Sequence, residues 1–310
     1  MKHLLKLLDL SGEEIEELLS IADQLKYEHH HDIPHPILAG KSLGMIFQKA
    51  STRTRVSFEV GMYQLGGKAL FLSANDMQIG RGEAVQDTAR VLSRYLDGIM
   101  IRTFAQSEVE SLAQHGSIPI INGLTDFCHP CQVLADLMTI REFRGGLKGL
   151  KMCYVGDGNN MCNSLIVGAL KTGMSMAAAC PKGYEPDKAV LDFAAGYGER
   201  FLLTDQVLRA AAGADVLVTD VWASMGQEGE AEKRRKAFAG WQINDEMVAA
   251  AAPGTMVLHC LPAHREEEIS AKVFEAHASE IFEEAENRLH AQKAVMVKLM
   301  GQKNENKYKL

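Results

Sequence analysis

The sequence predicts an α/β protein with two doubly wound domains, each a parallel sheet with helices on both faces. Strand-like and helix-like segments alternate along most of the chain, which is the pattern of parallel strands joined by crossover helices. A glycine turn, Arg144-Gly145-Gly146-Leu147, separates two such series. The length of 310 residues also exceeds the size at which a single core usually stops growing.

The first series opens with a helix. Ser11 to Tyr27 has apolar residues at helical spacing, and Ser11 with Glu14 forms a capping box. The histidines and prolines between His29 and Pro36 predict a loop in preference to a metal site. Strands are expected next at 43–47, 68–72, 98–101 and 118–122, with helices after them over 53–65, 84–95, 107–115 and 132–144.

The second series has strands at 151–155, 175–179, 216–219 and 255–259, with helices between them, and a last helix-like stretch covers 288–299. Gly156-x-Gly158 is part of a dinucleotide-binding fingerprint, but Met161 replaces the third glycine. We interpret these glycines as a tight strand-to-helix turn near the substrate. No NAD and no other cofactor are expected.

Composition and charge disfavour several classes of partner. Apolar residues make up 46% of the chain and charged residues 24%, as in ordinary globular proteins. The formal net charge of -7 favours neither nucleic acid nor a membrane surface. No apolar run is long enough to span a bilayer, and the start resembles neither a secretory signal nor a transit peptide. We expect a cytoplasmic protein, although a processed organellar form would look the same.

Six cysteines are scattered along the chain, at positions 128, 131, 153, 162, 180 and 260. Without a secretory signal they do not predict a disulfide framework. Cys128 and Cys131 form a single C-x-x-C, and a zinc site would need distant ligands such as His259. We expect core thiols or reactive groups, and no bound metal.

The strongest functional signal is Ser51-Thr52-Arg53-Thr54-Arg55, which follows the expected strand 43–47 and opens a helix. Backbone N–H groups and the positive dipole at a helix start favour an anion, and guanidinium groups match phosphate oxygens. The alternative is a capped helix whose arginines only face water. The position at a strand end, where open α/β sheets bind ligands, favours a phosphate site.

Polar residues also follow the third and fourth strands of this series. Arg102 comes at the end of the third strand, and His129 and Gln132 follow the fourth. In a parallel sheet these strand ends share one edge with the Ser51 motif. Taken singly, Arg102 fits a surface ion pair and His129 fits the start of a helix before Pro130. Together they predict a crevice that binds an anion.

Four motifs, spread over essentially the whole chain, resemble the ornithine branch of the carbamoyltransferase superfamily. They are Ser51-Thr52-Arg53-Thr54-Arg55, His129-Pro130-Cys131-Gln132, Asp220-x-x-x-Ser224-Met225-Gly226 and His259-Cys260-Leu261-Pro262. The first is shared with the aspartate enzymes, whereas the last two resemble the ornithine branch. The resemblance implies a carbamoyl-phosphate-binding domain over 1–143, an ornithine-binding domain over 144–288, and a C-terminal helix, about 289–310, that returns to the first domain. It also implies a homotrimer or a multiple of trimers.

The resemblance also implies which residues bind carbamoyl phosphate. These are Ser51, Thr52, Arg53, Thr54, Gln78, Arg102, His129, Gln132, Cys260, Leu261 and Arg288. Arg102 would bridge toward the carbonyl group, His129 would donate to the carbonyl oxygen, and Gln132 would accept from the carbamoyl amine. Such fixed donors stabilise the charge that develops on that oxygen. Gln78 would come from a neighbouring subunit, and Arg55 fits the scaffold as well as the substrate.

The residues implied to bind ornithine are Asn160, Asp220, Ser224 and Met225, and the implied catalytic residues are Arg102, His129, Asp220 and Cys260. The ornithine δ-amine should resemble lysine, so its neutral form costs about 4 kcal/mol at pH 7. Asp220 and Cys260 would lie near this amine, and a basic pocket would favour a Cys260 thiolate. Whether Cys260 removes the proton or positions the amine stays open. Covalent catalysis by Cys260 is a competing mechanism.

The implied reaction transfers the carbamoyl group to ornithine through a tetrahedral intermediate and gives citrulline and phosphate. The alternatives are another acceptor, such as putrescine, an acylated ornithine or aspartate, or a non-catalytic sensor on the same fold. The sequence does not separate arginine synthesis from arginine breakdown. The polar stretch from Ser224 to Lys236 is expected to form a mobile lid.

Overall fold

The computed structural model describes residues 1–78, 82–223 and 228–301, and the chain divides into two compact units. Unit 1 contains Met1–Leu5, Glu17–Leu124 and Leu289–Leu310, whereas unit 2 contains Lys6–Glu16 and Thr125–Arg288. The domain boundary expected from the sequence, near residue 143, stays a prediction.

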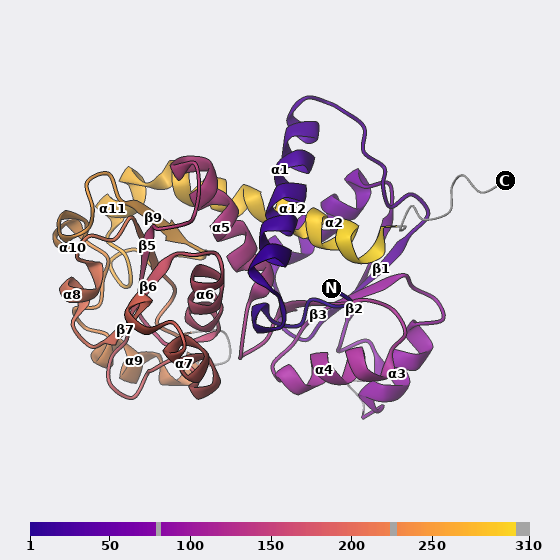
Figure 1. Cartoon of the computed structure of the whole chain (residues 1–310). Helices are drawn as coiled ribbons and strands as arrows, with labels where there is room; N and C mark the ends of the chain where they lie inside the picture. Colours follow the sequence, from indigo (N-terminus) through magenta and orange to yellow (C-terminus); the bar gives the residue numbers. More distant parts are fainter. Residues whose placement is uncertain (79–81, 224–227, 302–310) are drawn as a thin grey trace. The chain divides into compact units, whose positions relative to one another are not determined.

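Unit 1 is built on a four-stranded parallel sheet (Figure 1). Its strands are β1 (Ser42–Phe47), β2 (Lys68–Ser73), β3 (Gly98–Arg102) and β4 (Ile120–Leu124), in the order β2-β1-β3-β4. β1, β3 and β4 are buried along almost their whole length, as expected for strands covered on both faces. β2 lies at an edge and is more exposed. The four expected strands are confirmed.

Three crossover helices follow the first three strands: α2 (Thr52–Gln64), α3 (Val85–Leu92) and α4 (Gln106–His115). The chain goes from β1 outward to β2 and then back across β1 to β3. The carboxyl ends of β1 and β3 therefore form a topological switch point, where α/β sheets usually bind ligands.

α1 (Gly12–His30) begins as the sequence predicts. Ser11 Oγ accepts a hydrogen bond from the Glu14 backbone N–H at 3.2 Å, and a Glu14 carboxylate oxygen accepts from the Ser11 N–H at 3.0 Å. The helix continues beyond Tyr27, so the expectation of a loop at His29 and His30 is wrong. No glycine or proline interrupts this segment, and basic side chains are favourable in the last turn of a helix.

Unit 2 is built on a five-stranded parallel sheet. The strands are β5 (Lys151–Val155), β6 (Ser175–Ala179), β7 (Phe201–Thr204), β8 (Val216–Thr219) and β9 (Met256–His259), in the order β7-β6-β5-β8-β9. Four of them were expected from the sequence. β7 was not, because its four half-buried residues at the sheet edge are too few to show a pattern.

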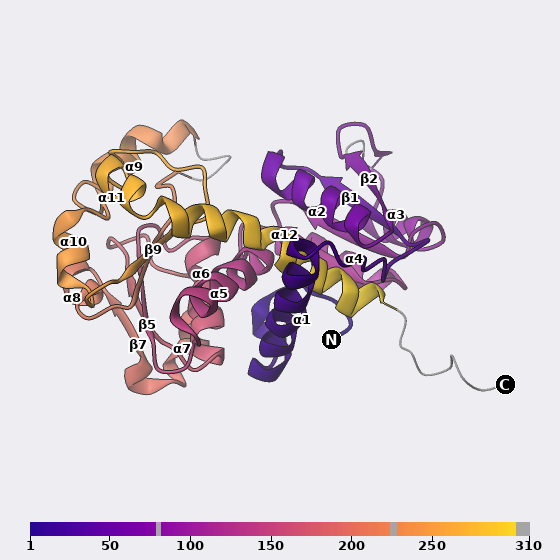
Figure 2. The same cartoon turned by 90° about the horizontal axis from the view of Figure 1, so that it is seen from above.

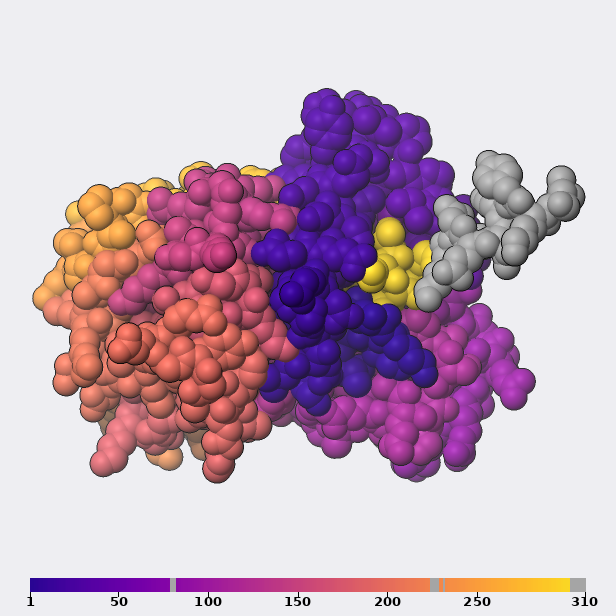
Figure 3. Space-filling model, viewed as in Figure 1, coloured from indigo at the N-terminus to yellow at the C-terminus, as the bar shows by residue number. Residues whose placement is uncertain are grey.

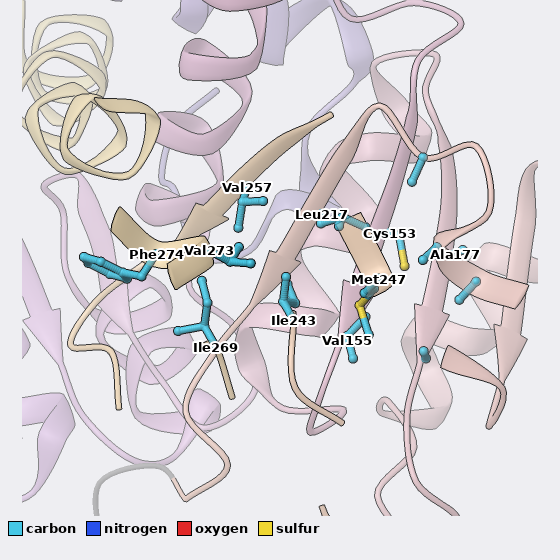
Figure 4. Close-up of a cluster of buried hydrophobic side chains, with 14 of the residues drawn as sticks. Cys153, Val155, Ala177, Leu217, Ile243, Met247, Val257, Ile269, Val273 and Phe274 are labelled. Carbon is cyan, nitrogen blue, oxygen red and sulfur yellow. The ribbon is translucent and has the colours of Figure 1, made fainter. Parts of the chain in front are cut away.

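The core of unit 2 joins four strands of this sheet, β5, β6, β8 and β9, to side chains from outside the sheet. Figure 4 shows Cys153 of β5, Leu217 of β8 and Val257 of β9 together with Ile243 and Phe274. All five side chains are buried. Burial of such apolar surface is the main term that stabilises the unit.

The helices of unit 2 include α5 (Pro130–Arg144), α6 (Asn160–Lys171), α7 (Lys188–Ala195), α8 (Val207–Ala211), α9 (Ala231–Ala237), α10 (Asp245–Ala250) and α11 (Ala271–Ala276). Short 3₁₀ turns are η1 (Leu7–Asp9), η3 (Gly198–Arg200) and η4 (Glu228–Glu230). α5 is buried along most of its length. It packs closely against α6 at Gly168, where a Cβ atom would lie 2.7 Å from the Val133 side chain.

The last helix, α12 (Ala278–Met300), begins ten residues before the expected stretch 288–299. Its second half packs on α2 in unit 1, where a Cβ atom on Gly61 would meet Met296 and Lys293. It also lies beside α1, to which it is joined by an ion pair between Lys298 and Glu17 (Figures 1 and 2). Only a small patch of this half is visible on the face in Figure 3. The expected return of the C-terminal helix to the first domain is confirmed.

No helix in the described part of the chain is both long enough and apolar enough to cross a membrane.

Candidate active site

The carboxyl ends of β1 and β3 lie side by side in unit 1. Phe47, the last residue of β1, is in register with Arg102, the last residue of β3. The Gln48 N–H donates to the Arg102 carbonyl oxygen at 2.9 Å, which holds the two strand ends together. The Arg102 side chain is only 4% exposed. This burial does not fit the alternative of an ordinary surface ion pair.

The Ser51 motif begins α2 at the same edge. Ser51 is the N-cap, and its Oγ accepts from the Thr54 N–H at 3.2 Å. The first turn of α2 contains no acidic residue. Thr54 is buried, Arg53 is half-buried and Thr52 is exposed. A helix start with two arginine charges nearby, Arg53 and Arg102, is well suited to a phosphate group.

Arg55 and Lys49 flank this motif. The Arg55 guanidinium lies 3.8 Å from the centre of the Phe71 ring and 3.5 Å from a Glu59 carboxylate oxygen, so Arg55 serves the scaffold. Lys49 is buried and its ammonium lies 4.3 Å from the centre of the Phe104 ring. Lys49 was not predicted from the sequence, although a lysine two residues before a phosphate-binding motif could have indicated it.

Gln78 lies in an exposed loop after β2, and its carbonyl oxygen accepts from the Glu83 N–H at 3.0 Å. Its expected contact with a neighbouring subunit stays a prediction.

His129 is the N-cap of α5 in unit 2, directly before Pro130. Its backbone N–H donates to Ser164 Oγ at 2.8 Å, and Ser164 Oγ donates to the Asn160 carbonyl oxygen at 2.9 Å. His129 is therefore tied to α6 and is buried. The interpretation as a residue at a helix start is correct, and it is compatible with a role in binding.

The side-chain amide of Gln132 is held by two buried carboxyl groups. Its Nε2 donates to Asp136 Oδ1 at 2.8 Å and to Glu284 Oε1 at 2.9 Å. Glu284 Oε2 accepts from the His259 backbone N–H at 2.9 Å, which joins this group to the end of β9. Gln132 Oε1 is buried and accepts no hydrogen bond from any described residue. It is an acceptor without a donor.

The two carboxyl groups are too close to ionise together. Burial raises the pKa of Asp136 to about 7, against the hydrogen bond from Gln132 and the charge of Arg288. Burial, and then the charge of Asp136, raises the pKa of Glu284 well above its usual range. The carboxyl pair therefore holds a proton at neutral pH, and the Arg288 charge balances the remaining negative charge.

Asp220 and Cys260 meet at the carboxyl ends of β8 and β9. Cys260 Sγ donates to Asp220 Oδ1 at 3.2 Å. The carboxylate also accepts from the Val221 N–H at 2.8 Å and from Asn159 Nδ2 at 2.8 Å. The expected proximity of Asp220 and Cys260 follows from the pairing of adjacent parallel strands.

The expectation of a Cys260 thiolate is wrong. Burial of the sulfur, followed by the charges of Asp220 and Glu284, raises the pKa of Cys260 well above its usual range. The surroundings of this sulfur are acidic and not basic, so the thiol form is favoured at neutral pH.

Asn159 was not predicted from the sequence as a site residue. Its Oδ1 caps α6 by accepting from Met161 N at 2.9 Å, while its Nδ2 holds Asp220. An asparagine directly before an apolar helix indicates an N-cap, and this pattern could have predicted its role in the helix. Its neighbour Asn160, the expected ornithine ligand, donates from Nδ2 to the Thr125 carbonyl oxygen at 2.6 Å.

His259 and Glu268 support the turn that follows β9. His259 Nε2 lies 2.9 Å from Glu268 Oε1, and both side chains are fully buried. The Leu261 N–H donates to His259 Nδ1 at 2.9 Å. This contact assigns the ring proton to Nε2. Leu261 has a positive φ of 59°, so the ring fixes an uncommon backbone conformation directly after Cys260.

The segment after β8 is anchored by a buried ion pair. Arg234 Nη1 lies 2.6 Å from Asp157 Oδ2 and also donates to the Trp222 carbonyl oxygen at 3.0 Å. The expected ligands Ser224 and Met225 lie outside the described residues. Of the expected lid up to Lys236, the described part forms η4 and α9. Its mobility stays a prediction.

Gly158 has a structural explanation. A Cβ atom there would lie 2.3 Å from the backbone of Glu185 and Pro186, so only glycine fits.

Cys128 and Cys131 are buried core thiols, and burial raises the pKa of each to about 12.

The two halves of the chain match the two domains of a known protein family. Residues 2–142 match the carbamoyl-P binding domain of the aspartate/ornithine carbamoyltransferases, and residues 148–299 match their Asp/Orn binding domain.

The chain belongs to the aspartate/ornithine carbamoyltransferase family.

Relatives in this family match almost end to end. The ornithine carbamoyltransferase of Carboxydothermus hydrogenoformans is 56% identical over 97% of this chain and 98% of its own length. That of Thermococcus kodakarensis is 53% identical over 97% and 96%. The solved structure of the Pyrococcus furiosus ornithine carbamoyltransferase matches with a TM-score of 0.92 at 51% identity, covering 97% of both chains.

Each unit of this carbamoyltransferase brings together some of the site residues that were expected from the sequence. Unit 1 gathers Ser51, Thr52, Arg53, Thr54 and Arg102 at one sheet edge. Unit 2 gathers Gln132, Asp220, Cys260, Leu261 and Arg288 around the end of β9 and the adjoining helices.

Proposed function

We propose that the protein transfers the carbamoyl group of carbamoyl phosphate to the δ-amine of L-ornithine, which gives L-citrulline and phosphate. The names of the relatives support this reaction, and the family also includes aspartate enzymes. The observation that carries the choice of acceptor is the Asp220 carboxylate beside Cys260. A carboxylate attracts the ammonium group of ornithine, whereas it repels the carboxylates of aspartate.

Phosphate is bound by groups of unit 1. Ser51, Thr52, Arg53 and Thr54 supply hydroxyl, backbone and guanidinium donors at the start of α2, and Arg102 adds a second buried cation. These groups hold the phosphate before transfer and also stabilise it as the leaving group. The first turn of α2 contains no carboxylate that would oppose this role.

The carbamoyl group is oriented at both of its polar ends. His129 and Arg102 donate to the carbonyl oxygen, on which negative charge develops during attack. Gln132 Oε1 accepts from the carbamoyl NH₂ group, which supplies the donor that this buried oxygen needs. Leu261 and Arg288 complete the set of residues proposed to bind carbamoyl phosphate.

The amine is bound and oriented by acidic groups. The Asp220 carboxylate binds the δ-ammonium group and accepts hydrogen bonds that place its nitrogen for attack. Cys260 contributes a neutral thiol that positions the amine and does not form a covalent bond to the substrate. The δ-nitrogen loses one proton to water before it attacks, and the new nitrogen–carbon bond gives a tetrahedral intermediate. The carbon–oxygen bond to phosphate then breaks, and the second proton passes from the nitrogen to the released phosphate.

The amino-acid end of ornithine is bound by Asn160, Ser224 and Met225 in this proposal. To bind substrate, the Asn160 amide gives up or shares its present bond to Thr125. Gln78 reaches carbamoyl phosphate from a neighbouring subunit of a homotrimer. The reaction belongs to arginine and ornithine metabolism in the cytoplasm and needs no cofactor.

A panel of acceptors tests the proposal. Purified protein is given carbamoyl phosphate with ornithine, putrescine, N-acetylornithine or aspartate, and phosphate release is measured. We expect kcat/KM for ornithine to exceed the others by at least about 10³-fold, because a buried site rejects acceptors that leave its polar groups unpaired. A preference for another acceptor contradicts the assignment of ornithine. No turnover with any of the four favours a sensor.

A further inference from the structure

Three imidazole rings that carbamoyl transfer does not use cluster in unit 1. His29 and His30 are the last residues of α1, and His290 lies on α12. The ring centres are 5.7 Å apart for His29 and His30, 5.7 Å for His29 and His290, and 5.9 Å for His30 and His290. The three distances form a nearly equilateral triangle.

This triangle has the dimensions of a metal site. Three imidazoles on one tetrahedral zinc ion, with Zn–N bonds of about 2.0 Å, have ring centres roughly 5 Å apart. Ring nitrogens of His30 and His290 and a carboxylate oxygen of Glu286 already lie within 4.8 Å of one another. His29 joins this group through the contacts of its ring with the rings of His30 and His290. The interplanar angles of 51°, 45° and 84° exclude a stack of parallel rings.

The burial of the three rings suits a metal that enters from solvent. His290 is fully buried, so its ring has a fixed position, whereas His29 and His30 are exposed and can adjust by rotation. Exposed neighbouring histidines are common by themselves. A buried third imidazole facing them from a distant part of the chain is not explained by solvation. Glu286, four residues before His290, lies on the same face of α12.

We propose that His29, His30 and His290 bind a divalent transition-metal ion, with zinc the best match, and so fasten the end of α1 to α12. Imidazole ligands suit zinc, nickel and copper more than magnesium or calcium. Three imidazole ligands leave a fourth position, and the Glu286 carboxylate is close enough to fill it. The ion stabilises the return of α12 to unit 1, because it binds only where the two helices are packed together.

The test measures Zn²⁺ and Co²⁺ binding to the full-length protein by calorimetry and by the visible spectrum of Co²⁺. We expect one ion to bind, and His29→Ala or His30→Ala to weaken binding by at least about tenfold, as the loss of one of three ligands should. Both side chains are exposed, so these variants should fold normally. Binding should fail below about pH 6, where the imidazoles are protonated.

Two controls make the result specific. His31→Ala removes a neighbouring histidine that instead stacks on Tyr27, and it should leave the affinity unchanged. His264→Ala removes a ligand from a second possible group, formed with Glu267 and Glu268. Equal affinity of the wild type and His30→Ala overturns the proposal, as does loss of the ion in His264→Ala. A Co²⁺ spectrum with thiolate charge transfer also overturns it, because that ion would be bound by cysteine.

Discussion

Gln132 shows how a residue's role is fixed by groups that never touch the substrate. The side-chain amide of a glutamine can point either way, and its direction follows from its hydrogen bonds. Here both N–H bonds face carboxyl oxygens, of Asp136 and Glu284. Reversing the amide would set its oxygen against those oxygens. The acceptor Oε1 is thereby directed away from the two carboxyl groups, where it can accept a hydrogen bond from the proposed donor, the carbamoyl NH₂ group.

Glu284→Gln tests this positioning role. Glu284 uses both oxygens as acceptors, for Gln132 and for the His259 N–H. A glutamine can accept with only one of them and leaves a buried donor unsatisfied, at about 1–3 kcal/mol. We expect kcat/KM for carbamoyl phosphate to fall by about 10- to 100-fold in steady-state kinetics.

The matched control is Glu286→Gln, which removes an exposed carboxylate from the same helix. It should leave the kinetics unchanged. A Glu284→Gln enzyme with wild-type kinetics would show that the carboxyl pair does not orient Gln132.

At the residue scale, the sequence predicted Gln132 through its motif but not the residues that hold it. Asp136 lies four residues later on α5, so helical spacing was a usable signal. Glu284 could not be predicted from the sequence, because only the tertiary fold brings α12 to α5. The direction of the Cys260 pKa shift was missed for the same reason, since Glu284 and Asp136 both contribute to it.

Among the elements, the start of α6 joins helix stability to the candidate site. Asn159 satisfies two backbone N–H groups at the helix start and also holds the Asp220 carboxylate. A cap residue at a functional position therefore has two measurable roles. They can be separated, because α10 carries a second asparagine cap, Asn244, whose Oδ1 accepts from Met247 N.

Asn159→Ala and Asn244→Ala form a matched pair. Each removes an asparagine cap and should lower the free energy of unfolding by about 1 kcal/mol, measured by urea denaturation. Only Asn159→Ala should also raise the KM for ornithine, by about tenfold or more, because Asp220 loses a hydrogen bond. Equal effects on KM would mean that Asn159 acts through stability alone.

Elements with a strong local pattern were predictable, and those defined by tertiary contacts were not. The buried strands β1, β5 and β8 are short apolar runs between turns, and their positions were expected. β7 is a strand only because it pairs with β6 at the sheet edge. The early start of α12 was missed because residues 278–287 are largely polar, although several of them face the interior.

At the scale of the whole molecule, one buried charge makes stability depend on pH. Lys293 on α12 is fully buried in unit 1, where its Nζ lies 2.7 Å from His35 Nε2 and donates to Gln64 Oε1 at 3.0 Å. Burial lowers the pKa of Lys293 to about 8, although the charge of Glu28 acts in the opposite direction.

The sign of the effect follows from proton counting. Between pH 8 and about 10.4 the unfolded chain binds a proton that the folded chain does not. The contribution of Lys293 to the free energy of unfolding should therefore rise with pH across this window, by up to about 3 kcal/mol. The buried thiols, whose pKa values are raised, act in the opposite direction, and they do so equally in the wild type and in variants of Lys293. Lys293→Met should lack this contribution, so that the stability of the wild type relative to Lys293→Met should increase when urea midpoints are compared from pH 7 to 10.

Lys298→Met is the control on the same helix, because Lys298 is partly exposed and paired with Glu17. The Lys298→Met variant should keep the pH-dependent contribution of Lys293 to the free energy of unfolding. Parallel pH curves for the wild type and Lys293→Met would contradict the lowered pKa of Lys293.

In the proposed reaction, a bond forms between the carbamoyl carbon and the δ-nitrogen of ornithine. This bond formation is tested most directly by NMR, with ¹³C-carbamoyl phosphate and ornithine labelled with ¹⁵N only at the δ position. We expect the product to show one-bond ¹³C–¹⁵N coupling in its ureido group, with one phosphate released for each coupled product. Phosphate release without this coupling would contradict the account.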